Sequence, residues 1–292
     1  MEVRSIQKTG KMHYLYLPTS WCKRYRISSE TKVYLTENND GTLLISSEKK
    51  EQAGKSINLT LPFKYRDSLI NLIMACYVNP ASSFKIKLER KVNMASLLDQ
   101  KNLMSGMEFV ELDGENITYE SSMSVNEPDS LLKTMVKKGK NLIYVMLENN
   151  SPALVQKYEE EIDRSKMLIQ KAVISSLALN QSTPLKAIDM YYTLQIAIEL
   201  ERMFDYLIQI GKDGRGFLRE VAPIMDSLKD ILEEITDLEY LEGLHFTKQV
   251  SLLSEYKNTS LDNSNKNRIK KHFQNIAEVL LDWSITKSLE NK

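Results

Sequence analysis

The sequence predicts a multi-domain α+β protein in three consecutive parts: a β-rich N-terminal domain (residues 1–50), a small α/β connector domain (51–126) and a C-terminal antiparallel helical bundle (127–292). Three observations predict it. Short alternating strands separated by turn residues fill the first part. In the second part, strands alternate with single helices. In the third, long stretches with apolar residues at helical spacing are interrupted only by short Asn-, Pro- or Gly-containing breaks.

The N-terminal part contains four predicted strands, at residues 2–8, 13–17, 32–36 and 42–46. Gly10 lies between the first two, where a tight turn needs the positive φ that glycine tolerates. Pro18 ends the second strand because it has no N–H for the ladder. Thr19 is then expected to cap a two-turn helix over residues 19–26, with Trp21 facing inward.

Positive charge is concentrated at the N-terminus. Between residues 1 and 27 one acid, Glu2, stands against six basic residues: Arg4, Lys8, Lys11, Lys23, Arg24 and Arg26. The whole chain has 39 basic and 39 acidic residues, so the excess is local. A local excess of this kind is typical of a surface that contacts phosphates. The alternative interpretation is a basic face that is only solvated.

The same stretch resembles a known family of DNA-binding domains. The run R-S-I-Q-K-T-G, then L-P-T-S-W, a basic helix and a hairpin with D-G-T-L-L-I, is similar to the AbrB/SpoVT (swapped-hairpin) domain over roughly the first 47 residues. In that family two chains exchange hairpins to make one β-barrel, so the resemblance implies a homodimer that binds double-stranded DNA. A segment this short also buries too little surface to be stable alone. The six basic residues fall where such domains gather their DNA-contacting side chains.

The connector follows a charged, glycine-containing stretch at residues 48–55, which is typical of a linker. Its expected elements are strand, helix, strand, helix and a two-stranded hairpin, over residues 56–61, 65–77, 84–88, 94–104, 107–112 and 117–119. Asp113-Gly114 joins the two strands of the hairpin. This order predicts a two-layer α/β unit, and no pattern within it indicates chemistry.

The composition, 42% hydrophobic and 27% charged, is that of a soluble globular protein. We expect a cytoplasmic location because the chain has no apolar run of transmembrane length and no signal peptide. Cys22 and Cys76 are isolated and are expected to be reduced thiols. His13, His245 and His272 are widely spaced, which argues against a zinc site or histidine catalysis. With no P-loop, no G-x-G-x-x-G and no nucleophile–base pair, we expect a protein that is not an enzyme.

The C-terminal part is expected to consist of long helices separated by breaks at residues 149–152, 181–184 and 214–216. Pro128 is near the first turn of the first helix and Pro184 near that of the third. The fourth helix is expected to break near Gly243. A polar stretch at residues 258–267 indicates a loop, and the last helix is predicted from Ile269 to Leu289.

Three stretches of the bundle resemble PhoU, a family of helical-bundle regulators of phosphate uptake: E-E-E-I-D-R at 159–164, L-E-R-M-F-D-Y at 200–206 and N-I-A-E at 275–278. The E-R-x-x-D pattern in the second is similar to the family's core motif. Archaeal-type members join an AbrB-like domain to a PhoU-like bundle through an α/β segment, which is the order expected here. Met203 and Phe204 depart from the family, in which small or glycine residues are usual, so helix packing near the motif is expected to differ.

PhoU bundles carry acidic-x-x-x-Asp motifs that bind metal clusters, so the resemblance implies a metal site. Five pairs have this spacing: 159/163, 201/205, 226/230, 233/237 and 278/282. The spacing puts both carboxylates on one helix face. The last three pairs are expected to be solvated. Glu201 and Asp205 continue a row of apolar residues, so these two carboxylates are expected to be buried and partnered. Glu159 and Asp163 are expected to be intermediate, because Asp163 flanks another apolar row.

Two kinds of partner remain open for these carboxylates. The candidate metal ligands are Glu159, Asp163, Glu201 and Asp205, whose oxygen donors suit iron, manganese, magnesium or zinc. The alternative is a buried ion pair with Arg164 or Arg202 and no metal.

Two functions from different classes follow. The leading hypothesis is a DNA-binding transcriptional regulator, of phosphate uptake and homeostasis by the PhoU resemblance, in which a helical sensor bundle acts on a dimeric barrel. The alternative is a PhoU-type adaptor that binds and down-regulates a phosphate transporter, through its ATPase or a sensor protein. In that case the barrel serves only for dimerisation.

Overall fold

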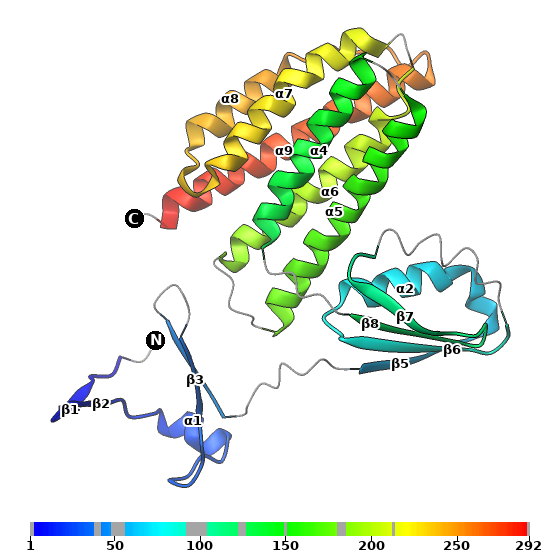
Figure 1. The fold of residues 1–292 in the computed structure, drawn as a ribbon. Helices are drawn as coiled ribbons and strands as arrows, with labels where there is room; N and C mark the ends of the chain where they lie inside the picture. The colour runs from blue at the N-terminus through cyan, green and yellow to red at the C-terminus, as the bar shows by residue number, and fades with distance from the viewer. Residues whose placement is uncertain are drawn as a thin grey trace. The chain divides into compact units, whose positions relative to one another are not determined.

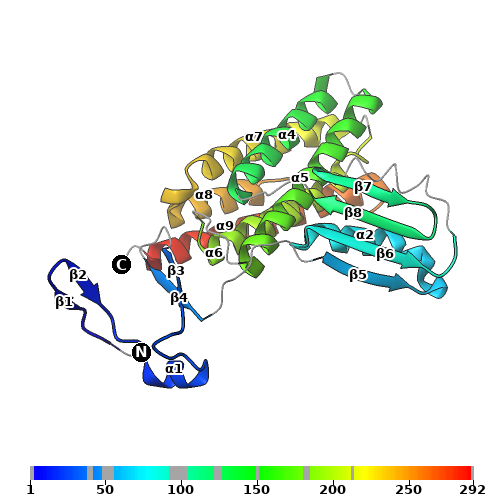
Figure 2. The same cartoon turned by 60° about the horizontal axis from the view of Figure 1, so that its bottom comes forward.

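The computed structural model describes residues 3–37, 42–47, 56–91, 104–121, 127–148, 151–179, 185–211 and 214–290. The chain divides into two compact units, Met1–Gln52 and Ala53–Lys292 (Figures 1 and 2). The predicted linker at 48–55 and most of the helix predicted at 94–104 lie outside the described residues. No helix that the structure describes combines the length and the apolar character needed to span a membrane.

The first unit contains two antiparallel two-stranded sheets and one short helix. Its elements are β1 (Gln7–Thr9) paired with β2 (Met12–Tyr14), α1 (Thr19–Arg24), and β3 (Tyr34–Glu37) paired with β4 (Leu43–Ser46). Thr19 does not cap the helix: Pro18 occupies the N-cap position, and no side-chain cap hydrogen bond forms. The described strands of this unit form separate sheets and no closed barrel, and none of its described residues is buried.

The connector is a four-stranded sheet with a helix packed against it (Figure 1). The sheet has the order β5-β6-β8-β7, formed by β5 (Ser56–Leu61), β6 (Ser83–Leu88), β7 (Met107–Leu112) and β8 (Asn116–Ser121). Only β5 and β6 are parallel. A 3₁₀ helix, η1 (Phe63–Ser68), leads into α2 (Leu69–Val78). These two elements occupy the place of the single helix that was expected at 65–77. Along β6 the apolar residues alternate inward and Lys85 and Lys87 face solvent, as the pattern predicted.

The rest of the chain forms a helical bundle, so the α+β character and the C-terminal bundle are confirmed. Its helices are α4 (Pro128–Glu148), α5 (Pro152–Leu179), α6 (Ala187–Leu207), α7 (Arg215–Glu233), α8 (Tyr240–Ser251) and α9 (Leu261–Glu290). Figure 1 shows α4, α5 and α6 side by side along one side of the bundle, and α7, α8 and α9 along the other. A single apolar core joins all six.

Three predicted helix boundaries in the bundle are wrong. Gly243 does not break a helix: it lies within α8, against the backbone of Leu281, and the break comes earlier, at η4 (Ile235–Asp237). The predicted loop at 258–267 is largely helical, because α9 already begins at Leu261. The third helix begins at Ala187 rather than at Pro184, which lies outside the described residues.

The large side chains of Met203 and Phe204, which stand where small residues are usual, are accommodated by the neighbouring helix. Both side chains are buried in the core. The Phe204 ring occupies the space beside Gly139 of α4, where any Cβ would overlap it. A glycine on the neighbouring helix therefore makes room for the large residue on α6.

α5 connects the bundle to the connector core. Met167 and Ile174 of α5 pack with the apolar residues of α2 and the sheet. Lys171, between them, is buried: its Nζ donates to Ser121 Oγ at 3.1 Å and lies 4.4 Å from the centre of the Tyr77 ring. Burial lowers the pKa of Lys171.

Candidate functional site

The candidate carboxylates lie on two adjacent helices. Glu159 and Asp163 are one turn apart on α5, and Glu201 and Asp205 are one turn apart on α6, which packs against α5 (Figure 1). The two pairs are close enough for each to perturb the other electrostatically, since Glu201 and Asp205 both raise the pKa of Asp163. The structure thus brings together all four of the predicted residues.

Glu201 and Asp205 are less buried than predicted, whereas Glu159 and Asp163 are intermediate as expected. Glu159, Asp163 and Glu201 are half-buried, whereas Asp205 is exposed. The reason is that α6 packs on its neighbours through a different stripe, which includes Ile196, Leu200, Met203 and Leu207. The prediction that Asp205 is buried is therefore wrong.

The cation beside Glu201 is Lys166, which the spacing of the acidic pairs did not predict. Its Nζ lies 3.9 Å from Glu201 Oε1, and both side chains keep less than a quarter of their exposure (22% and 24%). The predicted partners bind elsewhere: Arg164 Nη1 lies 2.5 Å from Glu161 Oε1, and Arg202 Nη1 lies 3.4 Å from Glu199 Oε1. An ion pair of Glu201 with Arg164 or Arg202 is accordingly not formed.

Crowding and burial make these carboxylates hard to ionise. Burial foremost, then the charges of Glu201, Asp205 and Glu159, raise the pKa of Asp163 to about 7, against an opposing effect of Lys166. Burial is also the main cause of a raised pKa at Glu159, Glu201 and Asp205. The arrangement therefore favours uptake of positive charge, as a proton or a cation, near neutral pH.

The oxygen donors suit a hard cation chemically, but their placement does not form a coordination sphere. Among the residues that the structure describes, no three His, Cys, Asp or Glu side chains are arranged to hold a metal ion. Lys166 already supplies one positive charge beside Glu201. The metal site stays a prediction.

A second polar cluster, at the contact of α6 with α9, was missed. Glu199 is buried and accepts hydrogen bonds from His272 Nδ1 (2.9 Å) and Asn275 Nδ2 (2.7 Å). Burial raises the pKa of Glu199, but these hydrogen bonds outweigh it and lower the pKa overall. His272 also stacks on Tyr206, and it partly opposes the burial that raises the pKa of Asp205. The signal was available, because Glu199 has apolar Ile196 and Met203 three and four positions away.

The other acidic pairs are mostly solvated, as predicted. Glu278 and Asp282 are exposed on α9. Asp230 and Glu233 are exposed and pair with lysines, Lys229 and Lys137. Asp226 is half-buried and pairs with Lys140 of α4.

The N-terminal basic residues are all exposed on the first unit: Arg4, Lys8, Lys11, Lys23, Arg24 and Arg26. Lys8 stands opposite His13 in the first hairpin, and Lys11 follows the turn at Gly10, whose φ is 62°. Lys23 and Arg24 form the last turn of α1.

Comparison with known families matches one part of the bundle. Residues 131–214 match the model of the PhoU domain. The matched range runs from α4 to the end of α6 and includes all four candidate carboxylates and Lys166. No curated protein and no solved structure matches the chain.

Proposed function

We propose that the protein regulates phosphate homeostasis, with the PhoU domain as its sensing module and the N-terminal unit as a dimeric module that binds duplex DNA. The sensing role is supported by the four carboxylates of α5 and α6, whose pKa values are raised and which lie within the range that matches the PhoU domain. A change in proton or cation occupancy there alters the repulsion between the two helices.

Contacts along α5 link the carboxylates to the connector. α5 carries Asp163 on the side of α6, and one and two turns later it carries Met167 and Lys171, which are inserted into the connector. A shift of α5 against α6 therefore moves residues that hold the connector. This route is a two-state hypothesis that mutations at either end test separately.

DNA binding rests on the six exposed basic residues. Replacing Lys8, Lys23 and Arg24 together by Ala should weaken binding to all duplex sequences and reduce the salt slope by about one for each lost phosphate contact. The matched control replaces three exposed lysines of the second unit, Lys87, Lys248 and Lys271. Equal DNA affinity of the two triple variants, both still folded, would contradict the proposal.

Dimerisation through the N-terminal unit is supported by its lack of buried residues. Its strands expose large apolar side chains, among them Ile6 (67%), Leu35 (62%) and Leu43 (55%), and a single copy gives them no core. We propose that a second copy covers them. Sedimentation of the full chain and of residues 55–292 tests this: the shortened chain should lose self-association and keep its helical content. An unchanged dimer would place the association in the bundle instead.

The alternative is a PhoU-type adaptor that acts on a phosphate transporter or its regulator. The two roles separate in a genome-wide map of DNA occupied by the native protein. Enrichment near phosphate-transport genes supports regulation of transcription, and the absence of enriched sites supports the adaptor.

A further inference from the structure

Two hollows, of about 690 Å³ and about 270 Å³, lie between α7 and α8, outside the matched PhoU range, and we call them together the groove. Their lining residues run from Glu220 in α7 to Glu234 at its C-cap, and from Leu241 in α8 to Leu253, two residues beyond its end. At 1.5 Å per residue the α7 side is about 21 Å long. The two hollows therefore follow facing sides of the two helices over about four turns.

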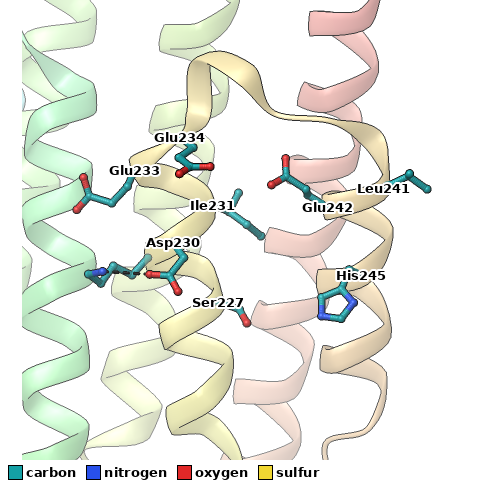
Figure 3. A pocket seen from close by; sticks show the side chains of 9 residues that line it. Ser227, Asp230, Ile231, Glu233, Glu234, Leu241, Glu242 and His245 are labelled. Carbon is teal, nitrogen blue, oxygen red and sulfur yellow. Dashed lines mark hydrogen bonds and ion pairs between the residues drawn. The ribbon is translucent and has the colours of Figure 1, made fainter.

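The larger hollow is acidic. Its lining carries four carboxylates, Asp230, Glu233, Glu234 and Glu242, against one lysine, Lys229. Figure 3 shows Glu242 projecting from α8 toward α7, whereas Glu233 points away, toward the helix whose Lys137 it pairs with. Glu234 is exposed and has no ion-pair partner among the described residues.

The smaller hollow is mainly apolar, and its polar lining residues are Gln249 and Glu220, whose carboxylate accepts hydrogen bonds from Ser254. Pro223, Ile224, Leu252 and Leu253 contribute to its lining, and Leu252 is 76% exposed. Gln249 also lines it, and its Oε1 is buried and accepts no hydrogen bond from the described atoms. A buried acceptor without a donor costs free energy in the folded chain.

We infer that this groove is the docking site for a basic amphipathic helix of a partner protein. The length, the apolar floor at one end and the excess of carboxylates at the other fit one helix of about 14 residues, since a helix laid in a groove contributes an apolar stripe flanked by charges. The complementary charge selects a cationic partner over an acidic one. The inference deepens the proposed function, on which it rests for the partner's role, by giving the partner's chemistry.

Binding is measured on the purified full chain, without DNA. The probe is a fluorescent peptide of about 18 residues, made of leucine and lysine with leucine at helical spacing. A peptide of the same composition in an order that destroys the apolar stripe is the control. The striped peptide should bind at least tenfold more tightly. Equal affinities would mean charge attraction without a groove, and no binding of either would also overturn the inference.

Variants of the acidic end locate the site. Glu234→Lys combined with Glu242→Gln changes the charge by three units. Glutamine at 242 keeps a side-chain oxygen that can accept the hydrogen bond that the Glu239 N–H now donates to the Glu242 carboxylate. The matched control, Glu278→Lys with Asp282→Asn, makes the same charge change on the exposed side of α9. The groove variant should weaken peptide binding roughly tenfold and the control less than twofold. Equal weakening by both overturns the inference.

The apolar end is tested separately. Leu252→Ser should weaken binding severalfold, whereas Leu289→Ser, at a similarly exposed leucine of α9 (71%), should not. Circular dichroism confirms that each variant is folded. If the groove variants instead abolish self-association of the chain, the occupant is a second copy and the inference of a separate partner is wrong. None of these outcomes depends on DNA binding, so a failure here is distinguishable from failure of the proposed function.

Discussion

Replacing Asp163 by Asn should stabilise the bundle at pH 8 and leave it unchanged at pH 4. The pKa of Asp163 is raised from 3.8 to about 7 in the folded chain. A carboxyl with a raised folded pKa binds its proton more tightly when folded, so its ionisation makes the folded state less stable as pH rises from about 4 to about 7. About three pKa units at 1.36 kcal/mol each give about 4 kcal/mol. Since Asp163 is only half-buried, solvent screening reduces this, and we expect about 2 kcal/mol.

Urea denaturation followed by circular dichroism, at pH 4, 6 and 8, measures this difference. Asp163→Asn should unfold at a higher urea concentration than wild type at pH 8, with the advantage shrinking through pH 6. Asp282→Asn, at an exposed position of α9, is the matched control and should follow wild type at every pH. A variant at 163 that is no more stable than wild type at pH 8, or equally more stable at pH 4, would refute the account of the cluster.

Three further predictions concern packing and the predicted metal. Gly139→Ala should destabilise the bundle by about 1 kcal/mol or more despite the better helix propensity of alanine, because the new methyl overlaps Phe204. Gly216→Ala is the control and should stabilise the bundle, since its methyl meets nothing within 4 Å. A higher melting temperature for Gly139→Ala than for Gly216→Ala would contradict this. Trp283→Phe should cost about 2 kcal/mol in urea denaturation, since buried Asp189 loses the 2.7 Å hydrogen bond from the indole N–H; an unchanged midpoint would show that Lys287 alone satisfies that carboxylate. If a metal binds the carboxylates, elemental analysis detects it and chelator lowers the melting temperature of wild type; a metal-free wild type with chelator-insensitive melting removes the metal prediction.

Much of the fold could be predicted because its patterns are local. In β6 apolar and polar residues alternate strictly, so the strand and its inward face follow from the sequence. β7 and β8 are joined at Asp113-Gly114, whose φ at Gly114 is 90°, as the turn residues predicted. Pro128 starts α4, because a missing N–H costs nothing in a first helical turn.

The start of α9 could not be predicted because tertiary contacts override its polar composition. Asn265, Lys266 and Lys270 are buried, although the sequence favours a loop up to residue 267. Lys266 pairs with Asp262 at 2.5 Å, and Lys270 donates to the Leu253 carbonyl at 2.8 Å. The first turns of α9 are therefore buried because their polar side chains have specific partners. The spacing of apolar residues in the sequence does not reveal such partners.

At the candidate site, too, the sequence predicted local features but not the contacts between helices. Helical spacing identified the carboxylates of α5 and α6 because it depends on one helix at a time. The partner of Glu201 depends on how two helices pack: Lys166 of α5 faces α6, whereas Arg164 binds Glu161 of its own helix. Asp205 is exposed for the same reason, since the rotation of α6 about its axis is set by its contacts with α4 and α9.

The measurement that tests the central claim most directly is phosphate uptake in cells that lack this protein. After a shift from scarce to abundant phosphate, wild-type cells should reduce uptake, whereas cells without the protein should continue at a high rate. Supplying the wild-type chain should restore the reduction, and a chain with both Asp163→Asn and Glu201→Gln should not. Uptake that falls to the same extent with and without the protein would contradict a role in phosphate homeostasis.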